Sequence, residues 1–96
     1  MSSSMEVNFA YKIPNGKLLK INLNYEENKI KKISINGDFF VYPEESIELL
    51  EHELENETLN RDKILNKLRK IKEKNNIDMI GISPEGITEA IMMCLK

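Results

Sequence analysis

Two short segments contain the residue types that could contact a charged partner molecule. The first is the turn Pro14-Asn15-Gly16, which is followed by Lys17, and the second is Gly37-Asp38-Phe39-Phe40. A lysine beside a turn can approach phosphate or carboxylate oxygens as a point charge, although a pair such as Lys12 and Lys17 is more commonly solvated. Each segment is therefore either a contact site or only a turn.

The second segment combines a turn with two aromatic rings. Gly37 allows backbone angles that other residues avoid, and Asp38 adds a charge. Because successive side chains of a strand point to opposite faces, one of Phe39 and Phe40 is expected to leave the core and meet solvent or a partner. The structural alternative is a turn or bulge at Asn36 to Asp38, with the outer ring resting on the rim.

Other reactive side chains offer little chemistry. His52 lies between two glutamates of a predicted helix, where neighbouring side chains point in different directions, so an exposed imidazole is expected instead of a catalytic base. Cys94 is the single cysteine and is expected to be a small buried hydrophobe. One His and one Cys cannot form a four-ligand zinc site without carboxylates. The sequence predicts no catalytic residues and no metal site in this chain.

Length and composition limit the class of protein. A chain of 96 residues forms one domain with a modest core and is too small for a catalytic domain with its own enclosed pocket. Its 41% hydrophobic and 31% charged residues are typical of a globular domain. The chain has no apolar run long enough to span a membrane, and its start lacks the apolar core of a secretory signal, so a cytoplasmic location away from membranes is expected.

The elements that must position these residues are predicted from hydrophobic spacing. Three segments alternate apolar and polar residues with a period of two, which predicts a three-strand antiparallel meander. They are Val7 to Ile13, Leu19 to Tyr25, and Ile33 to Ile35. Residues 1–5 are set apart as a flexible start, and residues 6–96 are predicted to form the single domain.

The second half of the chain is predicted to be largely helical. Pro43 is expected at the first position of one helix, Asn60 as the cap of a second, and Ser83 as the cap of a third. Ile77 to Ile82 is either a fourth strand or an extended connector. Strands followed by helices predict an α+β fold, in which about three helices pack on one face of a three-stranded antiparallel sheet.

Charge is segregated between the first two predicted helices. Residues 44–57 are strongly acidic, and residues 61–74 are strongly basic. The simplest interpretation is two solvated faces that pair with each other across adjacent antiparallel helices. The alternative is a basic surface for nucleic acid or an acidic protein. Because no aromatic residues are interleaved with the lysines and the net charge is −2, a nucleic-acid partner is not expected.

These segments together resemble a known family. The pattern K-x-P-x-G-K at Lys12 to Lys17, the Gly-Asp-Phe-Phe segment, and the Tyr-Pro-Glu-Glu that opens a helix are similar to the accessory domain of lipoate–protein ligases. That domain is either the small C-terminal domain or the separate small subunit of two-part ligases. The resemblance covers roughly Tyr11 to Leu95. Asn15 occupies a place where the family pattern often has a second glycine.

The resemblance implies a function. Lipoate–protein ligases use ATP, with magnesium, to activate lipoate to lipoyl-AMP and then pass the lipoyl group to a lysine of an acceptor domain. The implied role of this chain is a non-catalytic accessory subunit that binds no cofactor alone, forms a heterodimer with the catalytic subunit and is needed for activation. Lipoyl acceptor domains are then indirect partners. The implied partner- or adenylate-proximal residues are Pro14, Gly16, Lys17, Gly37, Asp38, Phe39 and Phe40.

Two other functions are weighed against this one. The fold of the accessory domain also resembles that of iron–sulfur scaffold and sulfur-acceptor proteins, but those functions depend on reactive cysteines, and Cys94 alone does not provide a cluster site. The competing hypothesis is a free-standing protein-interaction or basic-face binding module without a lipoate role.

Overall fold

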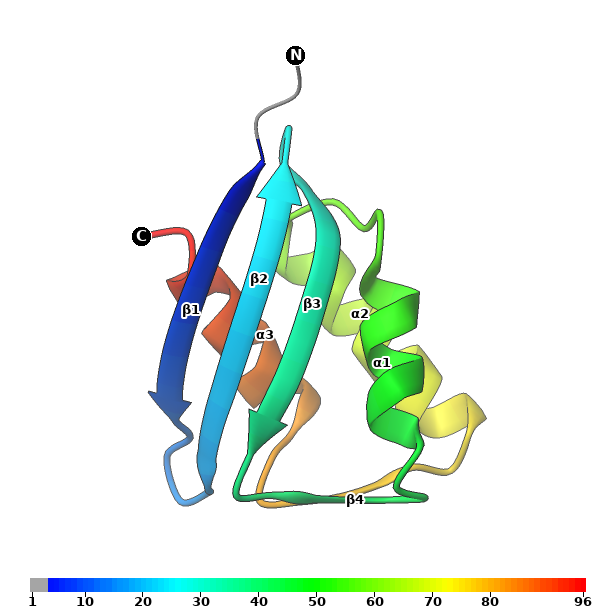
Figure 1. Cartoon of the computed structure of the whole chain (residues 1–96). Coiled ribbons are helices and arrows are strands. Elements are labelled where there is room, and N and C mark those ends of the chain that lie inside the picture. Colours follow the sequence, from blue (N-terminus) through cyan, green and yellow to red (C-terminus); the bar gives the residue numbers. More distant parts are fainter. Residues whose placement is uncertain (1–3) are drawn as a thin grey trace.

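A curved antiparallel sheet with helices on one face forms the body of the protein (Figure 1). The structure is a computed structural model and describes residues 4–96. The elements in chain order are β1 (Met5–Lys12), β2 (Leu18–Glu26), β3 (Lys29–Gly37), β4 (Phe40–Tyr42), α1 (Ser46–Leu54), α2 (Arg61–Lys74), β5 (Asp78–Ile80) and α3 (Pro84–Met93). The predicted α+β fold is confirmed. Of the flexible start predicted over residues 1–5, residues 1–3 lie outside the described residues, and Met5 belongs to β1.

The main sheet has the order β1-β2-β3, with both neighbouring pairs antiparallel. Ile21 of β2 lies between Phe9 of β1 and Ile35 of β3, so the apolar sets of all three strands share the inner face. The outer face is polar. The predicted meander is therefore confirmed, and its alternation determines which side chains meet the helices.

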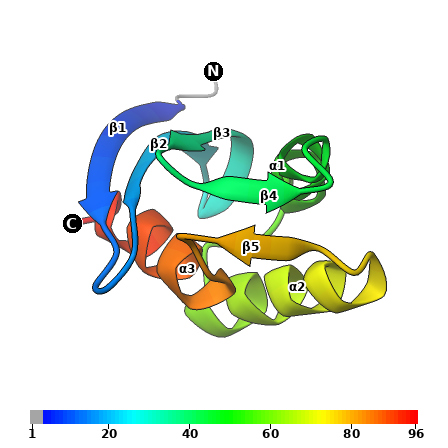
Figure 2. The same cartoon turned by 90° about the horizontal axis from the view of Figure 1, so that it is seen from below.

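The helices cover the inner face of this sheet (Figure 2). α1 packs against β3, α3 packs against β1 and β2, and α2 lies against both other helices. Each of the two predicted caps is present: Asn60 Oδ1 accepts from the N–H of Lys63 at 3.0 Å, and Ser83 Oγ accepts from the N–H of Gly86 at 3.0 Å. Within residues 4–96, no helix is long and apolar enough to span a membrane.

The first helix begins later than predicted. α1 starts at Ser46 and not at Pro43. β4 keeps the chain extended as far as Tyr42, which pairs with Asp78 of β5. The N–H of Ser46 then donates to the carbonyl of Pro43 at 3.0 Å, so Pro43 lies in a turn before the helix.

A second sheet of two strands crosses one end of the main sheet (Figures 1 and 2). The segment Ile77 to Ile82 does contain a strand, β5, in agreement with one of the two predicted alternatives. This strand pairs with β4 and not with the main sheet. Residues 40–42 and 78–80, far apart in the chain, therefore lie side by side.

The predicted pairing of α1 with α2 through their charges is mostly wrong. Lys67 of α2 does lie 3.4 Å from Glu57, which follows α1. The two arginines of α2 pair instead with α3, because α2 also packs against that helix. These ion pairs are Arg61 with Glu89 and Arg69 with Glu85.

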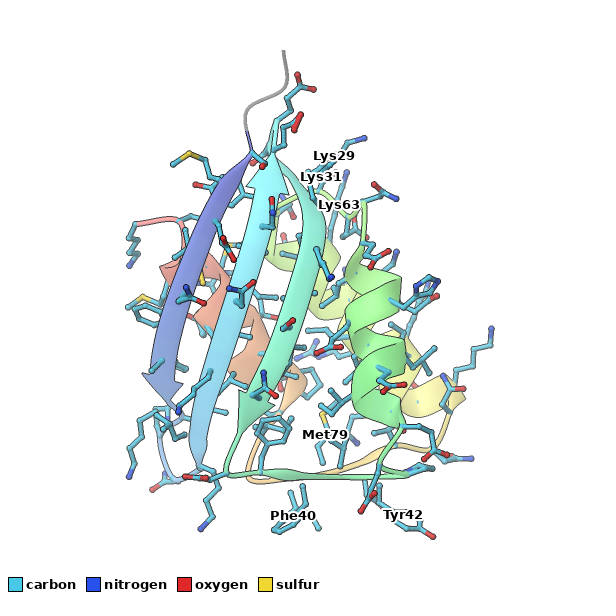
Figure 3. The ribbon with its side chains drawn as sticks, viewed as in Figure 1. Lys29, Lys31, Phe40, Tyr42, Lys63 and Met79 are labelled. Atoms are coloured by element: carbon cyan, nitrogen blue, oxygen red, sulfur yellow. The ribbon has the colours of Figure 1, made fainter. Side chains whose placement is uncertain are left out.

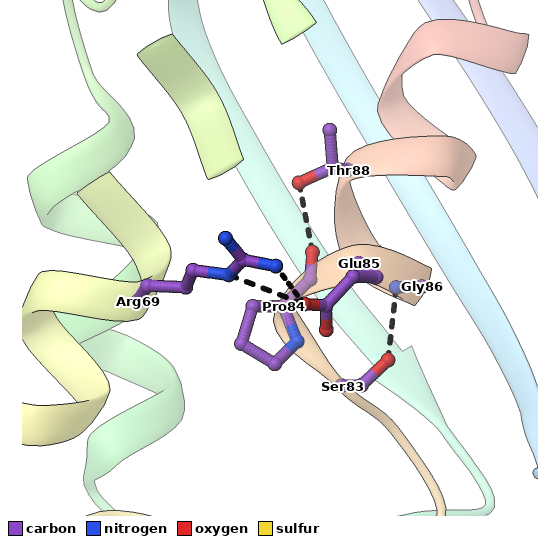
Figure 4. Close-up of polar contacts among 6 residues, drawn as sticks. All are labelled: Arg69, Ser83, Pro84, Glu85, Gly86 and Thr88. Atoms are coloured by element: carbon purple, nitrogen blue, oxygen red, sulfur yellow. Dashed lines mark hydrogen bonds and ion pairs between the residues drawn. The ribbon is translucent and has the colours of Figure 1, made fainter. Parts of the chain in front are cut away.

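One of these pairs joins α2 to the first turn of α3 (Figure 4). Arg69 Nε donates to Glu85 Oε2 at 3.1 Å, and a second guanidinium nitrogen donates to the same oxygen. Hydrogen bonding from the Arg69 guanidinium holds the pKa of Glu85 below its ordinary value. The joint between the two helices therefore includes a charge-assisted contact on the surface.

Candidate functional site

The two segments singled out in the sequence meet at one end of the main sheet. The N–H of Lys17 donates to the carbonyl of Gly81 at 3.0 Å, and the N–H of Asp38 donates to the carbonyl of Leu18 at 3.0 Å. Gly81 directly follows β5, and Leu18 opens β2. Both turns are thus fixed beside the β4–β5 sheet.

The first turn depends on a close approach to β5. Asn15 has a φ of 60°, in the left-handed region that asparagine tolerates better than most residues. The left-handed conformation at this position is therefore compatible with an asparagine. A Cβ on Gly16 would lie 2.9 Å from the carbonyl oxygen of Gly81, so only glycine fits there without a shift. Pro14 and Lys17 are exposed, and among the described residues Lys17 forms no ion pair.

The second turn separates the two aromatic rings. Gly37 has a φ of 151°, and a Cβ there would lie 2.2 Å from the carbonyl oxygen of Leu18. Asp38 is exposed. Phe39 is half-buried and packs against the core, whereas Phe40 is 73% exposed. The prediction that one ring leaves the core is confirmed, and the outer ring is Phe40.

Phe40 belongs to a larger exposed surface. β4 and β5 pair Phe40 with Ile80 and Tyr42 with Asp78, so these four side chains share the outer face of the small sheet. Tyr42 is 70% exposed and Ile80 is 61% exposed. Figure 3 shows Phe40 and Tyr42 pointing away from the molecule, while Met79 points toward it. We call Phe40, Tyr42, Asp78 and Ile80 the β4–β5 surface.

Sequence reasoning missed three members of this surface, namely Tyr42, Asp78 and Ile80. Each strand has only three residues, which is too short for a convincing period of two. Apolar residues stand at both inner and outer positions, since Val41 and Met79 turn inward while Phe40 and Ile80 turn outward, so the sequence gives no alternation to follow. Only the pairing between the strands brings the outer side chains together.

The reactive side chains singled out in the sequence lie outside the β4–β5 surface. Among residues 4–96, no group of three or more His, Cys, Asp and Glu side chains is arranged to hold a metal ion. Cys94 is buried, and burial raises the pKa of its thiol, which keeps it protonated and unreactive. His52 is exposed, with Nδ1 3.8 Å from Glu55. The β4–β5 surface offers apolar contact area, and the adjoining turns offer charged groups.

The chain is similar to known proteins of one kind. Residues 2–91 match the model of a family described as bacterial lipoate protein ligase C-terminus. Lipoate-protein ligase A subunit 2 of Thermoplasma acidophilum is 35% identical over 74 residues, which are 77% of this chain and 76% of that protein. A chain in the structural analysis of an archaeal lipoylation system, a bi-partite lipoate protein ligase and its E2 lipoyl domain from Thermoplasma acidophilum, matches with a TM-score of 0.73 and 31% identity. That match covers 95% of this chain and 97% of the solved one.

Proposed function

This chain belongs to the family of bacterial lipoate–protein ligase C-terminal domains, and we propose that it acts as the accessory subunit of a two-part ligase. The observation that supports this most is the match over nearly the whole length of both chains to a component of a bi-partite system. A curated relative is itself a subunit and not a complete ligase. The proposed partner is accordingly a separate catalytic subunit, in a heterodimer.

The β4–β5 surface is the proposed contact with that subunit. Among the described residues, the large apolar side chains that are exposed are Met5, Phe40, Tyr42 and Ile80, and the last three lie on this surface. Clustered aromatic side chains are typical of the energetic centre of a protein interface. Burying one exposed Phe side chain contributes about 1.5–3 kcal/mol, so covering this surface would stabilise a complex.

The step that this chain assists is proposed to be the activation of lipoate. In that step the lipoate carboxylate attacks the α-phosphorus of ATP, a phosphorus–oxygen bond forms, and pyrophosphate leaves. In the second step the acceptor lysine amine attacks the carbonyl carbon of lipoyl-AMP, and AMP leaves. Lipoate, ATP and magnesium are proposed to bind at the catalytic subunit, since this chain offers a docking surface in place of an enclosed pocket.

Lys17 is the residue of this chain proposed to help that step. It is exposed at the same end of the molecule as the β4–β5 surface, where its backbone is fixed to Gly81. With the surface docked, its ammonium group would face the partner. A positive charge placed near the phosphates favours the transition state in which negative charge moves onto the leaving pyrophosphate.

The test separates the two steps. Lipoate-dependent exchange of pyrophosphate into ATP is measured with the catalytic subunit alone, with this chain alone, and with both. Transfer to an acceptor domain is measured from pre-formed lipoyl-AMP. The expected result is exchange raised by at least about tenfold in the mixture, transfer changed by less than about twofold, and no exchange by this chain alone.

Other outcomes would contradict the proposal in different ways. Equal dependence of both steps on this chain would indicate a general folding partner for the catalytic subunit. Exchange catalysed by this chain alone would show an active site of its own. Binding to the catalytic subunit without any effect on either step would favour the alternative of an interaction module.

A further inference from the structure

The outer edge of β3 is covered in part by other segments of the chain. The N–H of Ile30 donates to the carbonyl of Glu57 at 2.9 Å, and the N–H of Asn56 donates to the carbonyl of Ile30 at 2.7 Å. Further along the strand, the N–H of Ile35 donates to the Glu51 carboxylate of α1 at 2.7 Å. α1 and the segment after it therefore satisfy hydrogen-bonding groups that β3 turns away from the sheet.

The outer edge of β1 is open. Among residues 4–96, no segment pairs with this edge, as Figure 1 shows. β1 spans eight residues in unbroken register with β2 and contains no proline. A long, regular strand with unpaired N–H and C=O groups is a template for another strand.

The inner face of β1 is also only partly covered. Val7, Phe9 and Tyr11 are half-buried. In contrast, Leu23 opposite Val7 and Ile21 opposite Phe9 on β2 are buried. The helices thus leave these apolar side chains partly exposed along the same edge that lacks a neighbouring strand. A strand added there would gain both backbone hydrogen bonds and apolar contacts.

The sequence of β1 is complementary to itself in one antiparallel register. With Phe9 opposite Phe9 of a second copy, Glu6 lies opposite Lys12, and Val7 lies opposite Tyr11. Glu6 and Lys12 are exposed on the outer face. The two-fold axis repeats the Glu6–Lys12 pair, so two oppositely charged pairs flank the apolar centre.

Other ways of joining two copies of β1 lose this complementarity. Moving the centre to Asn8 places Glu6 opposite Ala10, and moving it to Ala10 places Lys12 opposite Asn8. A parallel pairing in register brings Glu6 beside Glu6 and Lys12 beside Lys12, which repel. A slip of one residue turns the apolar set to the wrong face. The charges therefore select the antiparallel register centred on Phe9.

We propose that this chain forms a two-fold symmetric dimer in which two copies of β1 pair around Phe9 and join their sheets. The interface is isologous, because each copy contributes the same strand. This inference goes beyond the proposed function and does not rest on it. The β1 edge runs along the side of the sheet, and the β4–β5 surface lies across its end, so one copy can use both surfaces (Figure 1).

Charge reversal tests the register. The oligomeric state of the full chain is measured by analytical ultracentrifugation over a range of concentrations, for the unchanged protein and for Glu6→Lys and Lys12→Glu. A dimer is expected for the unchanged protein. Each variant opposes like charges at two places, so the dimer dissociation constant is expected to rise by about tenfold or more.

Mixing the two variants provides the decisive control. In an equimolar mixture of Glu6→Lys and Lys12→Glu, every charged pair across the interface is again a lysine opposite a glutamate, so the dimer is expected to return. The chain with both substitutions is expected to dimerise as well. Matched charge reversals away from β1, Glu48→Lys on α1 and Lys70→Glu on α2, are expected to leave the dissociation constant unchanged.

Three results would overturn the proposal. The first is a monomer at all concentrations, and the second is a dimer that the β1 variants do not weaken. The third is a failure of the mixture to restore what the single variants lose. If the chain is monomeric and Glu6→Lys weakens its binding to the catalytic subunit, the edge accepts a strand of that subunit and not a second copy.

Discussion

At the scale of single residues, the aromatic ring of Phe40 is exposed in the free chain and can be buried by a binding partner. We expect Phe40→Ala to weaken association with the catalytic subunit by about tenfold to a hundredfold, because an aromatic side chain at the centre of an interface often accounts for that much affinity. Since the ring is 73% exposed, the melting temperature of the free chain should not change. Calorimetric titration against the catalytic subunit and thermal melts of the free chain measure the two effects.

Phe39, Asp38 and Met5 supply comparisons for Phe40. Phe39→Ala is expected to lower the free energy of unfolding by roughly 2 kcal/mol, less than a full core deletion because the ring is only half-buried. Met5→Ala removes an exposed apolar side chain from β1 and should leave affinity unchanged. The single variant Asp38→Ala should also weaken binding to the catalytic subunit. If neither Phe40→Ala nor Asp38→Ala changes affinity, the interface lies elsewhere, and the basic face of α2 becomes the next surface to test.

Gly37 controls the conformation of the second turn. Gly37→Ala is expected to lower the free energy of unfolding by at least about 1–3 kcal/mol. Gly37 has a φ of 151°, and a Cβ there would lie 2.2 Å from the carbonyl oxygen of Leu18. Urea denaturation measures the loss. Asn36→Ala, at the exposed neighbouring position, should cost less than about 0.5 kcal/mol. Equal costs for both variants would show that the turn relaxes around an alanine.

At the scale of elements, the contribution of the α2–α3 contact to the stability of the fold should depend on pH. The Arg69 guanidinium lowers the pKa of Glu85 from an ordinary value of 4.5, so the charged carboxylate is bound more favourably in the folded state. This contribution is complete above pH 4.5 and is lost as the pH falls through the lower folded-state pKa. Because both side chains are more than half exposed, we expect it to be at most about 0.5–1 kcal/mol.

Glu85→Gln tests this dependence. The variant should be less stable than the parent protein in urea at pH 7, and the difference should shrink as the pH falls through the lowered folded-state pKa of Glu85 and the parent carboxyl group becomes protonated too. Glu48→Gln, on the exposed face of α1, should show no such pH-dependent difference. A difference that persists at low pH would mean that Glu85 acts through packing and not through its charge.

Elements with local signals could be predicted from the sequence, and those that depend on distant partners could not. Asn60 and Ser83 mark helix starts through their own side chains, and both caps are present in the structure. α1 was placed too early because the pairing of Tyr42 with a strand far along the chain overrides the preference of Pro43 for a first helical position.

The same distinction applies to the candidate site. Phe40 could be identified because alternation within its own segment forces one ring outward. Tyr42 and Ile80 could not, since their shared face exists only after β4 and β5 pair. The charge pairing of α2 failed for a similar reason, because composition does not reveal which helix will lie beside Arg61 and Arg69.

At the scale of the whole molecule, the pairing of β4 with β5 ties the first half of the chain to the second. The buried apolar residues of the sheet and all three helices form one cluster. We therefore expect a single cooperative unfolding transition, with a free energy of about 5–10 kcal/mol in water for a domain of this size. Far-UV circular dichroism and tyrosine fluorescence should report the same urea midpoint. Separate midpoints would show that the sheet and the helices unfold independently.

The partly covered edge of β3 limits how many copies of this protein can join through their sheets. A sheet with two open edges can add copies without end, as amyloid fibrils do. Here Glu51 and the segment after α1 hydrogen-bond to Ile35 and Ile30 at the edge of β3, which leaves β1 as the more accessible edge for an added strand. We therefore expect growth of the sheet through β1 to end at a pair of copies, and Glu51→Ala, which removes the acceptor for the Ile35 N–H, to favour larger assemblies at high protein concentration.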